Sequence, residues 1–273
     1  MSAIQAIVLG IVQGLTEFLP VSSSAHLRIV PALLGWNDPG AGFTAVIQLG
    51  TMAAVVIYFW GDLWKITLAW FGSLLHKEKR SDPEARMGWY LIVATIPIAI
   101  IGFALKDQIE TGARNLWLIA TALIVGGLLL WWADKVGSRR KEIPDLTTKD
   151  GVTIGLAQSL ALIPGMSRSG STISAGLFLG YTREEAARFS FLLSVPAVVL
   201  SGVFQLKDIG TGHSPGAVPT AIATVVSFIV GYLAIAWFLR YLTKHSTLLF
   251  VIYRVVMGLL LFGLLAAGTI SAR

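Results

Sequence analysis

The segment QGLTEFLPVSSSAH at residues 13–26 places a proline and three serines inside an otherwise apolar stretch. A second segment, PGMSRSGSTIS at residues 164–174, interrupts another apolar stretch with a proline, an arginine and several serines. The surrounding stretches, 3–35 and 151–182, are each too short for two membrane spans of about 20 residues. We therefore predict two re-entrant hairpins, in which a helix enters the membrane to mid-depth, breaks at the polar segment and returns to the same side.

The composition of the whole chain is that of a membrane protein. Of its 273 residues 55% are hydrophobic and 13% are charged, whereas soluble domains carry about 25% charged residues. The lack of cysteine in the sequence excludes a disulfide scaffold, a cysteine nucleophile and a thiolate metal site. The net charge of +6 resides in short loops, as the positive-inside rule of membrane proteins requires. We therefore expect the bilayer as a partner and no nucleic acid.

Six further apolar runs are long enough to cross a hydrocarbon core of about 30 Å. Five of them contain no Asp, Glu, Lys or Arg, and the sixth contains only Arg254. These runs are residues 43–60, 88–105, 116–133, 189–206, 217–239 and 248–268. The predicted fold is an all-α polytopic membrane protein with six transmembrane helices plus two re-entrant helix hairpins.

The loops between these runs predict the orientation. Basic residues are concentrated in loops 61–87 and 134–150, whereas loops 106–115 and 207–216 carry few. Because cytoplasmic loops are enriched in Lys and Arg, we expect the two basic loops in the cytoplasm and both chain termini outside. The first hairpin then enters from outside and the second from the cytoplasm.

Short matches between the two hairpins indicate an internal repeat. The sequence GIVQ at 10–13 parallels GLAQ at 155–158, and a serine follows each proline three residues later, at Ser23 and Ser167. Each half contains one hairpin and three spans, and an odd number of spans inverts the second copy. We therefore predict one membrane domain, residues 1–273, built as an inverted-topology repeat of residues 1–134 and 150–273.

The polar residues of the first hairpin indicate chemistry, because ionisable groups at membrane depth are expensive. Gln13 and Glu17 are four residues apart and share a helix face. The serines at 22–24 follow the break as natural N-caps of the returning helix, and Ser23 shares a face with His26. This cluster combines a carboxylate, hydroxyl groups and an imidazole at a helix N-terminus.

The second hairpin contributes a fixed positive charge. Ser167, Arg168 and Ser169 open another helix, whose free backbone N–H groups favour anions, and a guanidinium is a planar fork suited to phosphate. Two such N-termini facing each other predict an intramembrane oxyanion site, open to the outer side and reached from the bilayer, most economically by a lipid phosphate. Gln48 either lines this pocket or packs between helices. Arg254 either has a structural role, which we favour, or snorkels, or touches the phosphate.

The two polar segments closely resemble the signature motifs of the undecaprenyl-pyrophosphate phosphatase family, also called the bacitracin-resistance family. The resemblance covers essentially the whole chain, including IQLG at 47–50 and FSFLLSVP at 189–196. It implies a bacterial cytoplasmic-membrane enzyme that hydrolyses undecaprenyl diphosphate to undecaprenyl phosphate and inorganic phosphate. That reaction recycles the lipid carrier of peptidoglycan synthesis and gives bacitracin resistance.

The same resemblance implies the site residues. Glu17, Ser23, His26 and Arg168 match the catalytic set. Ser167 and Thr172 match positions that contact phosphate in the family, and Gln13 falls on a position that the family fills with Glu or Gln. From the polar clusters themselves we also expect Ser22, Ser24, Gln48 and Ser169 to bind the substrate. The family is metal-dependent, and we expect a divalent cation, Mg²⁺ or Ca²⁺, to bridge phosphate oxygens and Glu17. Gln13 carries no charge, so it can only add its carbonyl oxygen to that metal site.

Several alternatives stay open at this point. The nucleophile is Ser23 activated by His26 or Glu17, or His26 itself, or an activated water; we favour Ser23, which we expect at the N-cap with its hydroxyl facing the anion. The alternative function is a lipid or small-anion transporter or flippase, because inverted repeats recur in transporters. The expected partners are the polyprenyl diphosphate lipid, bacitracin as a competitor for that lipid, and a second copy of the chain in a homodimer.

Overall fold

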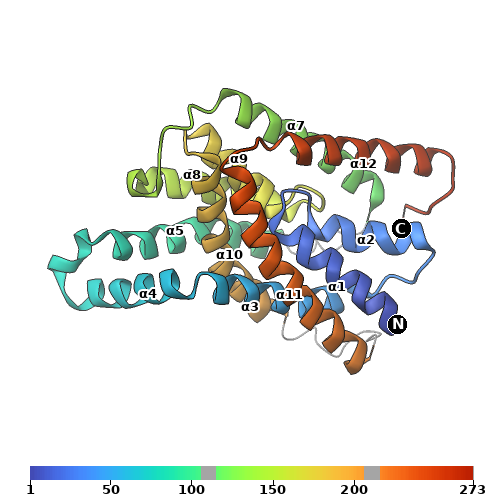
Figure 1. Cartoon of the computed structure of the whole chain (residues 1–273), viewed down its shortest axis with the longest axis horizontal. Coiled ribbons are helices and arrows are strands. Elements are labelled where there is room, and N and C mark those ends of the chain that lie inside the picture. The colour runs from blue at the N-terminus through green and yellow to red at the C-terminus, as the bar shows by residue number, and fades with distance from the viewer. Residues whose placement is uncertain (106–114, 206–215, 273) are drawn as a thin grey trace.

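The computed structural model describes residues 1–105, 115–205 and 216–272, and their regular elements are helices (Figure 1). The elements of the first part are α1 (Ala3–Phe18), α2 (Ser23–Leu34), α3 (Gly40–Tyr58), α4 (Trp60–Leu75), a short 3-10 helix (Lys77–Ser81), α5 (Pro83–Ala104) and α7 (Leu116–Val136). The second part contains two further 3-10 turns (Ile143–Asp145 and Ser159–Leu162), α8 (Thr148–Gln158), α9 (Arg168–Phe178), α10 (Arg183–Gln205), α11 (Ala217–Leu242) and α12 (Leu248–Ala266).

Within the described residues the predicted apolar runs lie almost entirely in helices, which confirms an all-helical structure of the polytopic membrane class for this part of the chain. By length and composition, α5, α7, α11 and α12 can each cross a membrane. A fifth candidate consists of α3 and α4 together, which are bent by 79° at Phe59. Residues 189–205 of the run 189–206 belong to α10, which is not among these candidates.

The prediction of a loop at 61–87 is wrong, because most of this segment is helical. Helix α4 begins at Trp60, and Trp64, Leu68 and Phe71 follow on its exposed face at helical spacing. An apolar stripe at this spacing is typical of an amphipathic helix, and the basic residues near the end of α4 obscured this pattern in the sequence. The predicted loops 106–115 and 207–216 fall almost entirely outside the described residues.

Both predicted hairpins are pairs of helices separated by a break. In the first, α1 ends at Phe18 and α2 begins at Ser23, so that residues 19–22 form the break. In the second, α8 is followed by the 3-10 turn Ser159–Leu162, and α9 begins at Arg168. The breaks lie where the prolines and serines predict them.

Glycines allow the first helix of each hairpin to approach a long helix closely. A Cβ atom on Gly10 of α1 would lie 2.7 Å from the carbonyl oxygen of Ala223 in α11, and Gly14 also packs on α11. In the second hairpin, a Cβ atom on Gly155 of α8 would collide with the carbonyl oxygen of Ala94 in α5. The matched glycines of the two hairpins therefore have the same packing role, each against a long helix from the other part of the chain.

The hydrophobic core joins the two parts. Phe18, Phe59 and Phe238 surround Phe191, with a ring distance of 5.3 Å between Phe18 and Phe191. In Figure 1 both chain termini lie at one end of the molecule, and the turn between α4 and α5 lies at the opposite end.

Candidate active site

The two breaks end in N-caps of the same geometry. Ser22 (φ 77°, ψ 100°) caps α2, and Ser167 (φ 71°, ψ 122°) caps α9. Each hydroxyl oxygen accepts a bond from the backbone N–H three residues later, and each lies within 3.2 Å of the hydroxyl of the serine two residues later. Positive φ is strained for a residue with a Cβ atom, so this shared conformation marks the two breaks as a site.

Two details of the sequence-based alignment are corrected by these caps. The N-cap of α2 is Ser22 rather than Ser23, so the structural counterpart of Ser167 is Ser22. The first break has one residue fewer between its proline and its N-cap than the second break has. The additional residue of the second break is Gly165, which has a φ of 98°. Ser23 and Arg168 are therefore the first residues of their helices.

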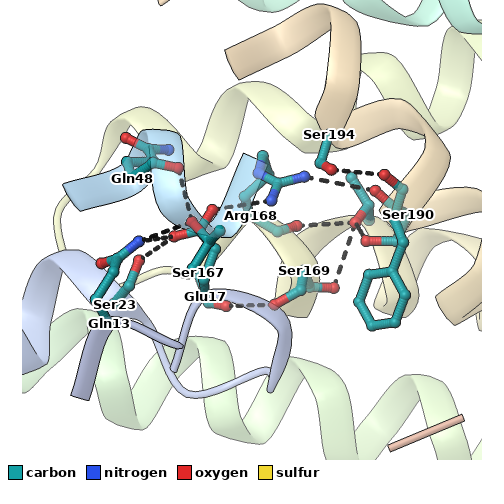
Figure 2. A network of polar contacts seen from close by, with 12 residues as sticks. Gln13, Glu17, Ser23, Gln48, Ser167, Arg168, Ser169, Ser190 and Ser194 are labelled. Carbon is teal, nitrogen blue, oxygen red and sulfur yellow. Dashed lines mark hydrogen bonds and ion pairs between the residues drawn. The ribbon is translucent and has the colours of Figure 1, made fainter. Parts of the chain in front are cut away.

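The carboxylate of Glu17 is the centre of the site (Figure 2). The Ser23 hydroxyl donates to its Oε2 atom at 2.7 Å, and Arg168 Nη2 donates to its Oε1 atom at 3.0 Å. Glu17 is 8% exposed, so the ion pair with Arg168 is largely shielded from solvent. The structure thus brings three of the four predicted catalytic residues into direct contact.

Gln13 is the third donor to the same carboxylate. Its Nε2 atom lies 3.1 Å from Glu17 Oε2 and 3.2 Å from the hydroxyl oxygen of Thr51, which donates to the Gln48 carbonyl oxygen. The Oε1 atom of Gln13 is buried and has no hydrogen-bond partner. Thr51 thereby positions the amide of Gln13, a role that the sequence did not predict.

The start of α9 is held by bonds to its neighbours. Arg168 Nη1 donates to the Ser190 carbonyl oxygen at 3.4 Å, and the hydroxyls of Thr172 and Ser190 are 2.6 Å apart. Ser169 donates to the carbonyl oxygen of Leu19 in the first break at 3.1 Å, which links the two breaks directly. Ser169 and Thr172 therefore hold the site together and do not line its cavity.

A cavity of about 210 Å³ opens between the two breaks. Its polar wall consists of side chains from both hairpins and from α3, and its apolar wall comes from α5, the second break and α10. The lining residues are Gln13, Glu17, Ser22, Ser23, Ser24, Thr44, Gln48, Ser167 and Arg168 on the polar side and Ile98, Ala161, Ala197 and Val198 on the apolar side. Gln48 thus lines the pocket, one of the two alternatives from the sequence, and the arrangement suits an anionic head attached to an apolar chain.

His26 lies apart from these groups. Its Nδ1 atom is 2.8 Å from the Ser22 carbonyl oxygen, and its Nε2 atom is 2.6 Å from the hydroxyl oxygen of Tyr253 in α12. His26 does not line the cavity, and the hydroxyl of Ser23 donates to Glu17 instead. The group positioned to take a proton from Ser23 is therefore the carboxylate of Glu17.

Arg254 is fully buried and ties the two breaks to α7. Its guanidinium donates to Pro20 in the first break and to Gly165 and Met166 in the second, at 3.0 Å each. Its remaining acceptors are the carbonyl oxygens of Ala122 and Leu123 in α7. All five acceptors are backbone carbonyls, which is the structural role favoured from the sequence.

The residues of the cavity fit a cation that takes most of its ligands from a bound phosphate. The described residues contain no group of three or more His, Cys, Asp or Glu side chains that could hold a metal ion. Glu17 supplies one carboxylate, and the unpartnered Gln13 Oε1 atom supplies a buried oxygen. Mg²⁺ is commonly bound by one or two carboxylates and substrate phosphates. A cation between the two side chains requires the Gln13 amide to turn, because its nitrogen now faces Glu17.

Three hydroxyl residues beside the site were not predicted from the sequence, namely Thr44, Thr51 and Ser190. Each is a hydroxyl residue within an apolar run, in the FTAVIQLGT segment or the FSFLLSVP segment. A hydroxyl at membrane depth often bonds to its own helix backbone, so these positions carry little signal by themselves. Tyr253 was missed because aromatic residues are common in spans.

Comparison with known proteins gives a consistent result. Residues 6–260 match the family described as bacitracin resistance protein BacA. The chain is 56% identical over 270 residues to a protein of Nocardioides sp. named undecaprenyl-diphosphatase, covering 98% of both chains. It is 56% identical over 290 residues to undecaprenyl-diphosphatase 3 of Frankia alni, covering 100% of this chain and 98% of the relative. It is 52% identical over 277 residues to the undecaprenyl-diphosphatase of Paenarthrobacter aurescens, covering 100% of both.

Proposed function

The chain belongs to the bacitracin resistance protein BacA family, and we propose that it hydrolyses undecaprenyl diphosphate to undecaprenyl phosphate and inorganic phosphate. The observation that carries this proposal is the contact of Ser23 and Arg168 with the two oxygens of Glu17. This contact places a hydroxyl nucleophile, a base and a phosphate-binding cation at one cavity. The reaction recycles the lipid carrier for peptidoglycan synthesis.

The proposed reaction begins with attack by Ser23. Its oxygen forms a bond to the terminal phosphorus while the bond from that phosphorus to the bridging oxygen breaks, and undecaprenyl phosphate leaves. The Ser23 proton moves to Glu17 Oε2, which lies 2.7 Å from the hydroxyl oxygen. Glu17 passes this proton to the bridging oxygen of the departing lipid phosphate and then takes a proton from the water that attacks the phosphoserine phosphorus. As the bond from phosphorus to the Ser23 oxygen breaks, Glu17 returns the proton to that oxygen and inorganic phosphate leaves. This division into two steps is typical of nucleophilic catalysis.

The positive groups around the cavity also support hydrolysis of a diphosphate as the reaction. Phosphoryl transfer depends mainly on positioning and on stabilising negative charge. The N-termini of α2 and α9 both border the cavity, and Arg168 is the cation beside it. Glu17 and Gln13 would hold a divalent cation, Mg²⁺ or Ca²⁺, which supplies further charge neutralisation when it is bound.

We also propose a placement in the bilayer. The protein lies in the bacterial cytoplasmic membrane as an inverted repeat of residues 1–134 and 150–273, with two re-entrant hairpins, an outward-opening site and both termini outside. The equivalent N-caps and the equivalent packing of Gly10 and Gly155 support the repeat. The position of both termini at one end supports their location on the same side (Figure 1). Competition by bacitracin for the lipid and a homodimer remain predictions.

The test is release of inorganic phosphate by the purified protein from a C55 diphosphate in detergent, with and without EDTA. We expect release that EDTA suppresses and added Mg²⁺ or Ca²⁺ restores. No release under any of these metals, together with movement of the lipid between the leaflets of reconstituted vesicles, would instead support the transporter alternative. The relatives reported above are named for hydrolysis, so nothing in the comparisons favours that alternative.

A further inference from the structure

The hydrogen bonds of His26 define which of its ring nitrogens carries a proton. The Ser22 carbonyl oxygen, 2.8 Å from Nδ1, can only accept a hydrogen bond, so Nδ1 is the protonated nitrogen. The ring is 4% exposed, and its two partners are a carbonyl and a phenol rather than a carboxylate. A buried cation without a counter-ion is costly, so the ring is neutral. Nε2 then accepts the bond from the Tyr253 hydroxyl.

This arrangement leaves His26 without a free lone pair. In a neutral imidazole, one nitrogen donates and the other accepts, and both functions are used by Ser22 and Tyr253. Attack on phosphorus by Nε2 requires the bond from Tyr253 to break. The structure therefore gives His26 a different task from nucleophile or base.

His26 instead makes two hydrogen bonds to the backbone of Ser22. The Ser22 carbonyl oxygen accepts both the backbone N–H of His26, at 3.2 Å, and the Nδ1–H of the ring. Ser22 is held at φ 77°, a conformation that is strained for a residue other than glycine. The next residue is Ser23, whose hydroxyl depends on this turn to reach Glu17. The counterpart, Ser167, is followed four residues later by Ser171 rather than by a histidine, so the extra bond serves the break that bears the nucleophile.

We propose that Tyr253 is a positioning residue for the reaction, which acts through His26 to hold the Ser22 turn and thereby the hydroxyl of Ser23. The tyrosine fixes the ring by donating to Nε2, and the ring fixes the turn through Nδ1. The rings of His26 and Tyr253 are also stacked, with centroids 5.5 Å apart. This inference rests on the proposed hydrolysis for its kinetic consequences, but the proton position on His26 does not depend on it.

The first experiment measures that proton position. ¹⁵N NMR of the protein labelled at histidine, in detergent, should show for His26 a protonated Nδ1 and an unprotonated Nε2, and His26→Asn assigns the signal. Tyr253→Phe should shift the Nε2 signal, because the accepted bond is lost. A protonated Nε2 with a bare Nδ1 would overturn the proposal. This measurement is valid whether or not the protein releases phosphate, so its failure is distinct from failure of the proposed function.

The second experiment is kinetic. We expect Tyr253→Phe to lower kcat about tenfold, the equivalent of one hydrogen bond of about 1.4 kcal/mol, with little change in KM. The matched control is Tyr232→Phe on α11, which removes a hydroxyl from a tyrosine of similar exposure, 39% against 40%. Equal effects of the two substitutions, or none at Tyr253, would contradict the proposal.

Substitutions of His26 separate positioning from proton transfer. In His26→Asn the amide nitrogen takes the place of Nδ1 and can still donate to Ser22, whereas His26→Ala cannot. We expect the Asn variant to keep several-fold more activity than the Ala variant and an unchanged pH profile. Adding Tyr253→Phe to His26→Asn should then have no further effect, because the bond is already absent. Detection of a phosphohistidine at residue 26 would overturn the proposal. Equal loss of activity in the Asn and Ala variants, with one limb of the pH–rate profile absent in both, would overturn it as well.

Discussion

The Arg168 guanidinium in the second break and the Glu17 carboxylate in the first lie 3.0 Å apart and form an ion pair between the two hairpins. Arg168 uses its Nη2 atom for Glu17 and its Nη1 atom for the Ser190 carbonyl oxygen. Both contacts depend on the fork of the guanidinium, which holds the cation at the cavity wall. A phosphate that enters the cavity competes with Glu17 for this fork.

Arg168→Lys is therefore expected to lower kcat about 100-fold, comparable to the loss of one donor to a developing oxyanion. An ammonium is a point charge and cannot reproduce two directed bonds. The measurement is phosphate release at saturating lipid. Arg188→Lys is the matched control, because Arg188 pairs with Asp62 away from this cavity. Near-normal turnover of the Arg168 variant would remove the guanidinium from the transition state.

Ser23→Ala should lower kcat at least about 100-fold, whereas Ser24→Ala, which removes a neighbouring cavity hydroxyl, should have a much smaller effect. A rapid acid quench of the wild-type protein with substrate should trap a phosphate on Ser23, which mass spectrometry can locate. The phosphorylated peptide should be absent in the Ser23 variant. Full activity of that variant would point to water as the attacking group.

Gln13→Glu tests the proposed role of Gln13 in metal binding. A second carboxylate beside Glu17 strengthens binding of a divalent cation, so half-maximal activity should occur at a lower Mg²⁺ or Ca²⁺ concentration. Gln13→Leu should raise the metal requirement, because the carbonyl oxygen is lost. Gln158→Leu is the matched control, since this buried glutamine occupies the corresponding position of α8 and does not line the cavity. Unchanged metal dependence in both Gln13 variants would exclude Gln13 as a ligand.

Arg254→Leu is expected to destabilise the fold more than the loss of any surface charge. It leaves the carbonyl oxygens of Pro20, Gly165 and Met166 without their donor, and each unsatisfied buried acceptor costs about 1–3 kcal/mol. Thermal unfolding in detergent should show a clear fall in Tm. Arg240→Leu, at an exposed position near the end of α11, should change Tm little. Comparable Tm values for the two variants would contradict the structural role of Arg254.

The carboxylate of Asp150 gives a prediction about pH. Burial raises its pKa, but hydrogen bonds from Thr147 and Tyr181 outweigh this effect and lower the pKa below the ordinary value of 3.8. A carboxyl whose pKa is depressed by folding stabilises the fold above its unfolded pKa and loses that effect as pH falls through its folded pKa. The Tm difference between wild type and Asp150→Asn should therefore be full at pH 7 and shrink below about pH 4. A constant difference across this range would contradict the assignment.

The sequence predicted the elements of the fold better than their geometry. The prolines and serines located both breaks, because a proline ends a helix and a serine caps the next. Helix α4 was missed because basic residues near its C-terminal end suggested a loop, although Trp64, Leu68 and Phe71 have helical spacing. The long helices are all similarly apolar, so the sequence could not predict how they are oriented against one another. Their orientation depends on tertiary packing.

At the site, the polar segments predicted which residues meet but not their partners. Glu17, Ser23 and Arg168 come together as expected. The spacing could not predict that the His26 ring points away from the cavity. Its direction depends on a hydrogen bond with Tyr253, which lies more than 200 residues later in the sequence. The exact cap was also out of reach, since three consecutive serines are equally good caps by residue type.

Arg254 has a consequence for how the lipid reaches the cavity. A movement that separated the two breaks would remove hydrogen-bond acceptors of the Arg254 guanidinium on at least one side. Each hydrogen bond from a charged donor contributes about 1.5–3 kcal/mol to stability. Arg254 thus holds the two breaks together and opposes their separation. A ligand therefore has to enter the cavity while the two breaks stay joined, and Ile98, Ala197 and Val198 form the apolar wall beside which the hydrocarbon tail of the proposed lipid would lie.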